Sequence, residues 1–265
     1  MAEFETLLWE EPEPGTVLIT LNRPPMNAVT IGMLDEIRHA MAEVAANPAH
    51  RVVIFTGAGE RAFSAGADLA QFEDEFARAS ELPPMYFRYA TKADLLALET
   101  LPKPVISAIN GTAVGEGLEI AMASDFRIAG RSARLGFPEA NIGLIPASGG
   151  CSRIVKLVGL ARAKEMVMLG ELMTAEEAER NGLLWKVVDD DALLTEAVAL
   201  AAKLAKKAPL ALGMAKAVLR ACVDTDMTAG HTVEMLAQNV LMDSADHQEG
   251  VRAFLERRPP TFTGR

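Results

Sequence analysis

The chain has 265 residues, half of them hydrophobic, and a formal net charge of −10. This length and composition predict one large domain, or one domain with an appendage, around a sizeable core. The acidic balance, without basic clusters mixed with aromatic residues, disfavours nucleic-acid binding, and no apolar run approaches the ~18 residues that a membrane span needs.

The remaining compositional signals argue against metal and disulfide chemistry. The four histidines form no metal-ligand pair, so we expect no metal. Cys151 and Cys222 have apolar neighbours and are predicted to be buried free thiols. The N-terminal segment lacks the basic and apolar regions of a signal peptide, which predicts a cytoplasmic location.

Strands alternate with helices in the first part of the chain. Residues 4–10 and 16–21 are predicted strands, separated by a turn that contains Pro12, Pro14 and Gly15. Apolar spacing predicts an amphipathic helix over 30–46, and the apolar run 51–56 is typical of a strand buried on both faces. Residues 71–101 are predicted to be helical, with a break at Pro83-Pro84. This order indicates an α/β fold.

The second part of the chain begins in the same way and ends in helices. A strand at 105–109 precedes a glycine-rich turn, a helix over 118–124 and a strand at 126–129. Further helices are predicted over 148–170, joined near Gly159, and over 174–181, where Thr174 and Glu177 form a capping box. A strand at 184–188 follows. From residue 191 the pattern is helical, with breaks at Pro209 and Gly230.

Two of three glycine-rich passages have unconvincing functional interpretations. Gly57–Ala62 follows a strand as G-x-G-x-x-A, but the immediate helix and the later acidic residue of a dinucleotide site are missing. Ala62–Gly66 is close to the nucleophile elbow of hydrolases, with Ser64 as nucleophile. The histidines His231 and His247 and the aspartates Asp226 and Asp243 would complete such a site. Ser64 lies well past the strand end, so a small residue in a tight turn is the preferred interpretation.

The third passage, Gly115–Glu119, opens a helix. Its glycines are explained either by close packing or by a turn whose backbone N–H groups meet developing negative charge on a carbonyl oxygen. Glu119 in this passage and Glu139 each follow a turn, which makes them a candidate acid/base pair. A solvated helix face for Glu119 and an ordinary turn acid for Glu139 are the alternatives.

A series of motifs occurs in a characteristic order along almost the whole chain. The motifs are Asn22-Arg-Pro, AFSAGADL (62–69), KPVISAING (103–111), GEGLE (115–119), LGFPE (135–139), GLIP (143–146) and Gly149-Gly150. With them the chain resembles the enoyl-CoA hydratase/isomerase, or crotonase, superfamily. The resemblance implies a ββα superhelix (spiral) core, placed at 1–195, and a C-terminal all-helical region at 196–265. It also implies a homotrimer or a dimer of trimers.

The resemblance implies specific roles for four residues. The backbone N–H groups of Ala67 and Glu116 would form the oxyanion hole for the thioester oxygen. Residue 116 is usually glycine in the family, and its carboxylate is expected to point to solvent. Glu119 would hold and activate water while Glu139 gives a proton to the α-carbon. Two close carboxyls should titrate as a coupled pair, one with a raised pKa.

The reaction implied is syn hydration of a 2-enoyl-CoA, or the reverse dehydration. Both glutamates are present, and Ala147 stands where dienoyl-CoA isomerases carry an aspartate. An enoyl-CoA delta-isomerase or another acyl-CoA lyase is the alternative within the fold, and a scaffold that has lost activity is the non-enzymatic one. The family places the substrate and CoA along Arg23, Met26, Ala28, Ser64, Ala65, Gly66, Asp68, Leu69, Phe72, Gly115 and Leu144. In the family the CoA phosphates lie near basic side chains, some from the C-terminal helices of a neighbouring subunit, and Arg23, Arg252, Arg257 and Arg258 are the candidates here.

Overall fold

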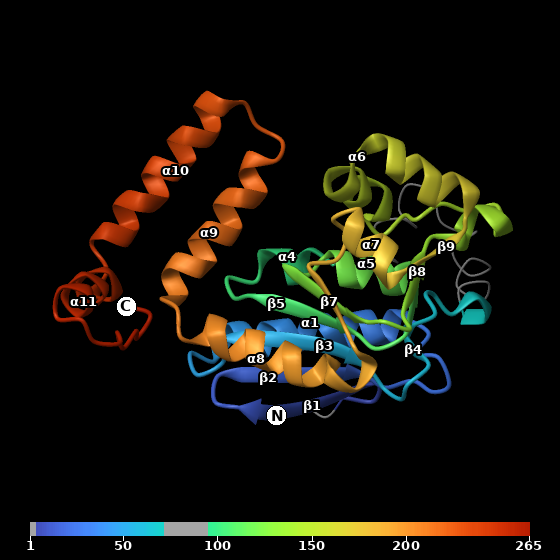
Figure 1. Ribbon diagram of the computed structural model, residues 1–265, viewed down its shortest axis with the longest axis horizontal. Coiled ribbons are helices and arrows are strands. Elements are labelled where there is room, and N and C mark those ends of the chain that lie inside the picture. Colours follow the sequence, from blue (N-terminus) through green and yellow to red (C-terminus); the bar gives the residue numbers. More distant parts are fainter. Residues whose placement is uncertain (1–3, 72–94) are drawn as a thin grey trace, which may run out of the picture.

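A six-stranded sheet forms the centre of the molecule in the computed structural model, which describes residues 4–71 and 95–265 (Figure 1). Its strand order is β1-β2-β3-β5-β7-β10, with β1 antiparallel to β2 and the other neighbours parallel. The strands are β1 Leu7–Glu13, β2 Thr16–Leu21, β3 Val52–Gly57, β5 Val105–Ile109, β7 Phe126–Gly130 and β10 Lys186–Val188.

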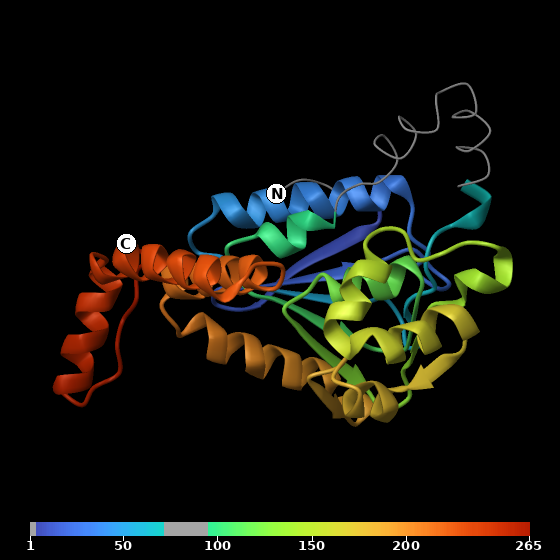
Figure 2. The ribbon, with the colours of Figure 1, turned by 90° about the horizontal axis from the view of Figure 1, so that it is seen from above.

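Alternation along the central strands builds a core on each face of this sheet. Val53 and Phe55 pack into the larger core, and Val52 and Ile54 pack into the smaller one. The larger core is covered by α1 (Ile31–Ala46) and α4 (Leu96–Thr100), and the smaller one by α8 (Leu193–Ala205), so that α1 and α8 lie on opposite sides of the sheet (Figure 2). The prediction of a strand buried on both faces is confirmed.

A smaller four-stranded sheet lies beside the first, in the order β4-β6-β8-β9. Its strands are β4 Ala62–Ser64, β6 Thr112–Val114, β8 Arg134–Gly136 and β9 Leu172–Thr174. Strands β3, β5 and β7 of the large sheet lead directly into β4, β6 and β8 of the small one. These pairs, followed by helices, make the ββα spiral, and the predicted fold class is confirmed.

The small sheet is surrounded by short helices and one long one. They are α5 Glu116–Met122, the 3-10 helix Pro138–Ile142, α6 Gly150–Leu169 and α7 Ala175–Arg180. A further 3-10 helix, Asp190–Ala192, follows β10 and contacts β7 of the large sheet. Gly159 interrupts α6 with φ 76° and ψ 161°, as predicted. The predicted capping box is present, because Thr174 Oγ1 accepts from Glu177 N and the Glu177 side chain accepts from Thr174 N.

The last three helices extend away from the sheets (Figure 1). They are α9 Pro209–Cys222, α10 Met227–Met242 and α11 Ala245–Leu255, and they expose large apolar side chains such as Leu219, Leu236 and Phe254. Such surface is suited to subunit docking, although the trimer and the division after residue 195 stay predictions. Helix α8 packs on β3 and β5 of the sheet.

Several local predictions are wrong. Strand β1 continues through Pro12, which an edge strand tolerates. Gly230 lies buried inside α10, and the break before that helix is at 223–226, where Asp226 caps it by accepting from Thr228 N and Ala229 N. Cys151 and Cys222 are free thiols, but both are only half-buried.

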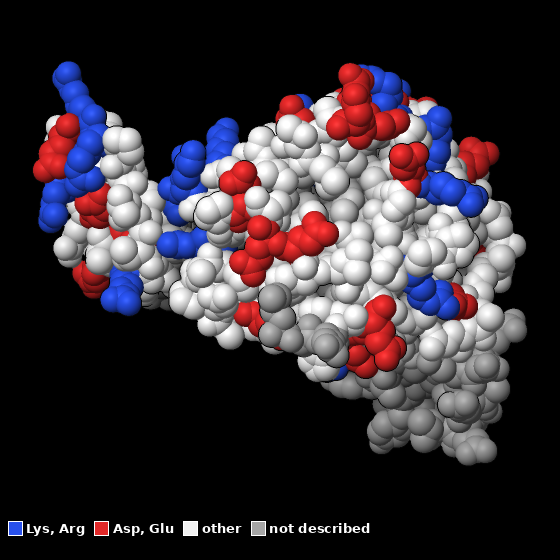
Figure 3. All heavy atoms as spheres, turned by 90° about the horizontal axis from the view of Figure 1, so that it is seen from below, with Lys and Arg blue, Asp and Glu red and all other residues white. Residues whose placement is uncertain are grey.

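The surface and the described helices give two further facts. Lys and Arg form small groups among Asp and Glu on the face shown in Figure 3, without a continuous basic track. Over residues 4–71 and 95–265, the helices are too short or too polar to cross a bilayer.

Candidate active site

The predicted site begins at the turn between β6 and α5. Gly115 has φ 52° and ψ −129°, a backbone conformation that favours glycine, and its N–H donates to Gly136 O in β8 over 3.2 Å. A Cβ atom on residue 115 would lie 3.2 Å from Glu139 Oε1. The glycine therefore lets the Glu139 carboxylate lie against the start of α5.

A second backbone segment lies beside this turn. Gly66 has φ +86°, and a Cβ there would lie 2.9 Å from Val114 O and 3.5 Å from Glu116 N. Ala67 pairs with Val29 in a parallel bridge, in which Val29 N donates to Gly66 O and Asp68 N donates to Val29 O. These two bonds use the groups that flank Ala67, so its own N–H faces away from Val29. Residues 66–67 and 115–116 are thus brought together.

Glu119 is enclosed at the end of the first turn of α5, with 2% of its surface exposed. Its Oε1 accepts from Gly150 N over 2.6 Å, and the Ser148 backbone N–H donates to the same carboxylate. Burial is the largest effect on its pKa and raises it, and the charges of Glu116 and Glu139 raise it further. The two N–H groups lower it in part, and the resulting pKa is about 7. Near neutral pH this group therefore exchanges a proton readily.

Glu139 follows Pro138 at the start of the first 3-10 helix. It is half-buried, and burial raises the pKa of its carboxyl. Its Oε2 is shielded from solvent and has no hydrogen-bond partner among the described residues. Buried polar atoms are ordinarily paired, so this oxygen is suited to meeting a proton or a ligand.

Glu116 is the main correction to the predicted site. Its residue is 6% exposed, and its Oε1 accepts from Ser148 Oγ over 2.8 Å, so the expected orientation toward solvent is wrong. Residues three apart lie on the same face of a helix. The segment that covers Glu119 at the start of α6 therefore covers Glu116 as well.

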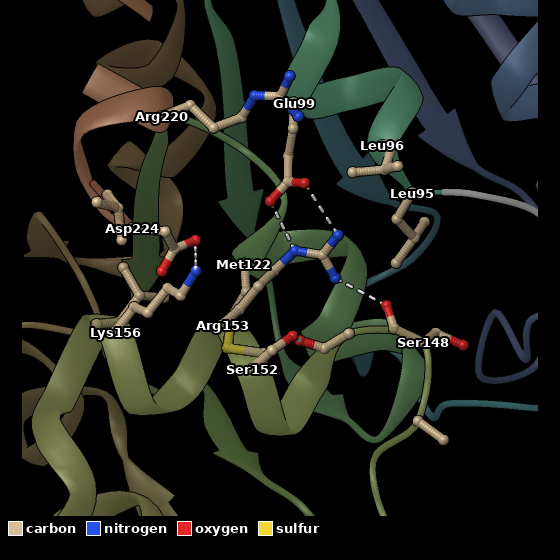
Figure 4. Close-up of a pocket in the computed structure, with 14 residues that line it drawn as sticks. Leu95, Leu96, Glu99, Met122, Ser148, Ser152, Arg153, Lys156, Arg220 and Asp224 are labelled. Atoms are coloured by element: carbon tan, nitrogen blue, oxygen red, sulfur yellow. Dashed lines mark hydrogen bonds and ion pairs between the residues drawn. The ribbon is translucent and has the colours of Figure 1, made fainter. Parts of the chain in front are cut away.

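The segment before α6 has its own supports. A Cβ on Gly150 would lie 2.6 Å from Glu119 Oε1, and Gly149 has φ +97° with no room for a side chain against Arg153 Nη1. Arg153 Nη1 donates to Ser148 O over 2.7 Å, while Nε and Nη2 donate to the two oxygens of Glu99 over 2.7 and 3.2 Å (Figure 4). Arg153 thus fixes the backbone that holds Glu119.

A cavity of about 530 Å³ lies next to this segment (Figure 4). Its lining joins α4, α6 and the end of α9, and Ser148 and Gly149 form one wall. Apolar Leu95, Met122 and Val223 share the lining with charged groups. Glu119 and Glu139 are not among the lining residues, and the cavity adjoins their surroundings through Ser148 and Gly149.

The predicted substrate residues near the N-terminus line up against the 65–69 segment. Ala65 N donates to Met26 O over 2.9 Å, and Arg23 pairs with Asp68 over 2.5 Å. The carbonyl oxygen of Ala28 accepts a 3.4 Å hydrogen bond from Arg23 Nη1. Leu69 and Leu144 are about half exposed, at 51% and 48%. Phe72 lies outside the described residues.

The serine hydrolase interpretation conflicts with the structure. Ser64 is fully buried, accepts from Gly66 N over 3.2 Å and packs against Gly117, so its hydroxyl supports the turn. Helices α10 and α11, which carry His231 and His247, lie at the opposite end of the molecule from β4 (Figure 1). The candidates Arg252, Arg257 and Arg258 are at the same distant end of the chain.

Three residues that support the site were not predicted from the sequence: Ser148, Arg153 and Asn27. Asn27 is 1% exposed with φ 53°, a left-handed conformation that asparagine adopts more readily than most residues. Its Nδ2 donates to Ala58 O and Ala62 O over 3.0 and 2.9 Å, and its Oδ1 accepts from Arg23 N. The sequence signal for Asn27 was its position directly after Pro24-Pro25-Met26, where a turn is expected.

The fold and the site together define a class of protein. A ββα spiral brings two carboxyls of raised pKa against a glycine turn, which is an arrangement for acid/base chemistry. Across residues 4–71 and 95–265, no three His, Cys, Asp or Glu side chains are grouped to hold a metal ion. The family model described as enoyl-CoA hydratase/isomerase matches residues 11–265, and the chain belongs to this family.

Relatives of known name agree with this assignment. The chain is 36% identical over 260 residues to a crotonyl-CoA hydratase of Syntrophomonas wolfei, covering 98% of each chain. It is also 36% identical over 253 residues to a 2,3-dehydroadipyl-CoA hydratase of Escherichia coli, covering 94% of this chain and 95% of the relative. The crystal structure of an enoyl-CoA hydratase from Bacillus anthracis has a TM-score of 0.90 and 35% identity, over 98% of this chain and all of the other.

Proposed function

We propose that this protein is an enoyl-CoA hydratase, which adds water syn across the double bond of a 2-enoyl-CoA or removes it in reverse. The observation that carries the proposal is the pair Glu119 and Glu139: two shielded carboxyls with raised pKa values that meet at the β6–α5 turn. The acyl groups named for its relatives differ, so the acyl chain is left open.

The backbone around this pair is suited to polarising a thioester. In the proposed mechanism the thioester oxygen accepts from the N–H groups of Ala67 and Glu116, and the closeness of residue 66 to Glu116 N supports this assignment. Withdrawal of electrons toward that oxygen makes the β-carbon electrophilic and stabilises the enolate that forms. The proposed reaction uses no metal and no cofactor beyond the CoA of the substrate.

In the hydration step Glu119 takes up one proton and Glu139 gives one up. The water oxygen bonds to the β-carbon while its proton passes to Glu119, and the double-bond electrons move to the thioester as an enolate. The enolate then takes a proton from Glu139 at the α-carbon. Hydration therefore needs Glu119 ionised and Glu139 protonated, and two coupled carboxyls with raised pKa values readily share one proton.

Hydration of crotonyl-CoA, followed as loss of the enoyl absorbance, tests the proposal. We expect Glu119→Gln and Glu139→Gln each to lower kcat by ~10² to 10⁴, the usual contribution of a general acid or base. Glu176→Gln on α7 is the matched control, because Glu176 lies on the surface paired with Arg131. Full activity in either site variant would contradict the assigned role.

An isomerase is separated from a hydratase in the same preparation. Moving a double bond needs one proton shuttle between two carbons, so a delta-isomerase would convert a 3-enoyl-CoA with little hydration of crotonyl-CoA. A fluorophosphonate should leave the protein unlabelled, in keeping with the burial of Ser64. Profiling acyl chains of different length and branching would identify the substrate. The trimeric assembly and the cytoplasmic location stay predictions.

A further inference from the structure

We propose that Glu116 is a positioning residue for Glu119: together with Ser148, it sets the position and the charge environment of the Glu119 carboxylate. The inference rests on the proposed function only in treating Glu119 as the base. The resemblance of the chain to its family assigns residue 116 a backbone role alone, and glycine, its usual residue there, has no side chain.

The contacts join both carboxylates to one serine. Glu116 and Glu119 project from the same face of the first turn of α5. Ser148 donates its hydroxyl to Glu116 Oε1 over 2.8 Å and its backbone N–H to Glu119. Gly150, two residues later, donates its N–H to Glu119 Oε1 over 2.6 Å. A change at Glu116 or Ser148 is therefore transmitted directly to Glu119.

Burial makes the charge of Glu116 effective. The two residues are 6% and 2% exposed, so little water screens the repulsion between their carboxylates. The surrounding elements present Glu139 from the 3-10 helix, Cys151 from α6 and the N–H groups that precede and begin α6. After burial, Glu116 is the largest influence that raises the pKa of Glu119, ahead of Glu139.

The chemical consequence concerns the strength of the base. A carboxylate that binds a proton more tightly takes it from water more effectively, up to the point where it is already protonated at the working pH. Removing the Glu116 charge should weaken Glu119 as a base and let it ionise at lower pH. The acid limb of the pH profile then moves, which a purely structural role for Glu116 would not produce.

Two substitutions separate charge from contact. Glu116→Gln keeps the size of the side chain and an oxygen that accepts from Ser148 Oγ, but removes the charge. Ser148→Ala keeps the charge and the backbone N–H to Glu119, but removes the hydroxyl. Glu116→Gly, with the residue usual in the family, is the second charge-removing variant in case the first fails to fold. Glu176→Gln again controls for loss of a surface carboxylate.

The kinetic test is the pH profile of kcat/KM for crotonyl-CoA. We expect the acid limb to move down by about one pH unit in Glu116→Gln and in Glu116→Gly, the scale of a close like-charge interaction. We expect it to stay in place in Glu176→Gln, and in Ser148→Ala to stay within half of that shift while kcat falls about tenfold. An unmoved acid limb in both charge-removing variants would overturn the proposal.

A second readout does not need catalysis. Carboxyl absorption in the infrared, or carbon-13 NMR with labelled glutamate, reports the titration of Glu119 after subtraction of the Glu119→Gln spectrum. The titration should move to lower pH in Glu116→Gln whether or not the protein hydrates crotonyl-CoA. If the protein does not hydrate crotonyl-CoA but the titration of Glu119 shifts in Glu116→Gln, only the proposed function is contradicted. If the titration of Glu119 does not shift, only this inference is contradicted.

Discussion

The backbone N–H of Gly150 donates to Oε1 of Glu119 over 2.6 Å, which joins the first residue of α6 to the first turn of α5. This bond opposes the burial that raises the pKa of Glu119, and so keeps an ionised form accessible near neutral pH. A glycine is needed for the approach, since a Cβ at residue 150 would lie 2.6 Å from the same oxygen and closer still to Pro146.

Gly150→Ala should therefore damage catalysis more than folding. The added methyl displaces the Glu119 carboxylate, and a misplacement of about 1 Å costs on the order of 10²-fold in rate. We expect a loss of this size in kcat for crotonyl-CoA. Gly32→Ala is the control, because that exposed glycine is inside α1 and its Cβ would meet only Thr30 Oγ1 at 3.7 Å. Equal activity of the two variants would contradict the geometry.

Glu119→Gln should lower kcat by ~10² to 10⁴ and, above pH 7, make the protein more stable. With a pKa raised to about 7, Glu119 binds a proton in the folded chain that the unfolded chain has already released. Stability therefore falls as pH rises from about 4.5 to 7, by about 3 kcal/mol at 1.36 kcal/mol per pKa unit. The amide of glutamine avoids this loss and still accepts from Gly150.

Urea denaturation at pH 5 and pH 8 measures the effect. The stability difference between Glu119→Gln and the wild type should grow from the lower pH to the higher one. A difference that stays constant would show that the pKa of the carboxyl is not shifted, and one that shrinks with pH would show that folding lowers it.

Asn27→Asp should destabilise the fold by about 3 kcal/mol, measured by the same method. The change replaces the Nδ2 donor by a carboxylate oxygen that faces the carbonyls of Ala58 and Ala62, at a position 1% exposed. Asn141→Asp is the control, because Asn141 is exposed and makes one 3.3 Å bond to Gly170 O. We expect a cost below about 1 kcal/mol there, and equal costs would contradict the role of Asn27.

Local patterns predicted the long elements well because their signals come from the chain itself. Residues 52–55 are apolar at every position, as expected for a strand buried on both faces, and Thr174 and Glu177 carry a complete cap within four residues. The three-residue strands β4, β6, β8 and β9 have no such signal, since pairing with one another defines them. The helix break predicted at Gly230 is wrong, because packing of this buried glycine inside α10 outweighs its weak helix propensity.

The predicted site shows the same division between local and distant information. The family motifs point to Glu119 and Glu139, and the structure brings both to the β6–α5 turn. The orientation of Glu116 depends on what covers the first turn of α5, and that cover comes from Ser148, far along the chain. The role of Arg153 likewise appears only when α4 and α6 are packed together.

Arg153→Ala should loosen the segment that carries Ser148 and Gly150. The guanidinium is 13% exposed and its partner Glu99 is 23% exposed, and it also donates to Ser148 O over 2.7 Å. Because the substitution leaves Glu99 without its partner, we expect a loss of about 2 kcal/mol in stability and about tenfold in kcat. Arg38→Ala, which breaks the exposed pair with Asp35, should cost less than about 0.5 kcal/mol and leave kcat unchanged. Urea denaturation and crotonyl-CoA kinetics measure both, and an unchanged kcat in Arg153→Ala would show that this arginine does not support the site.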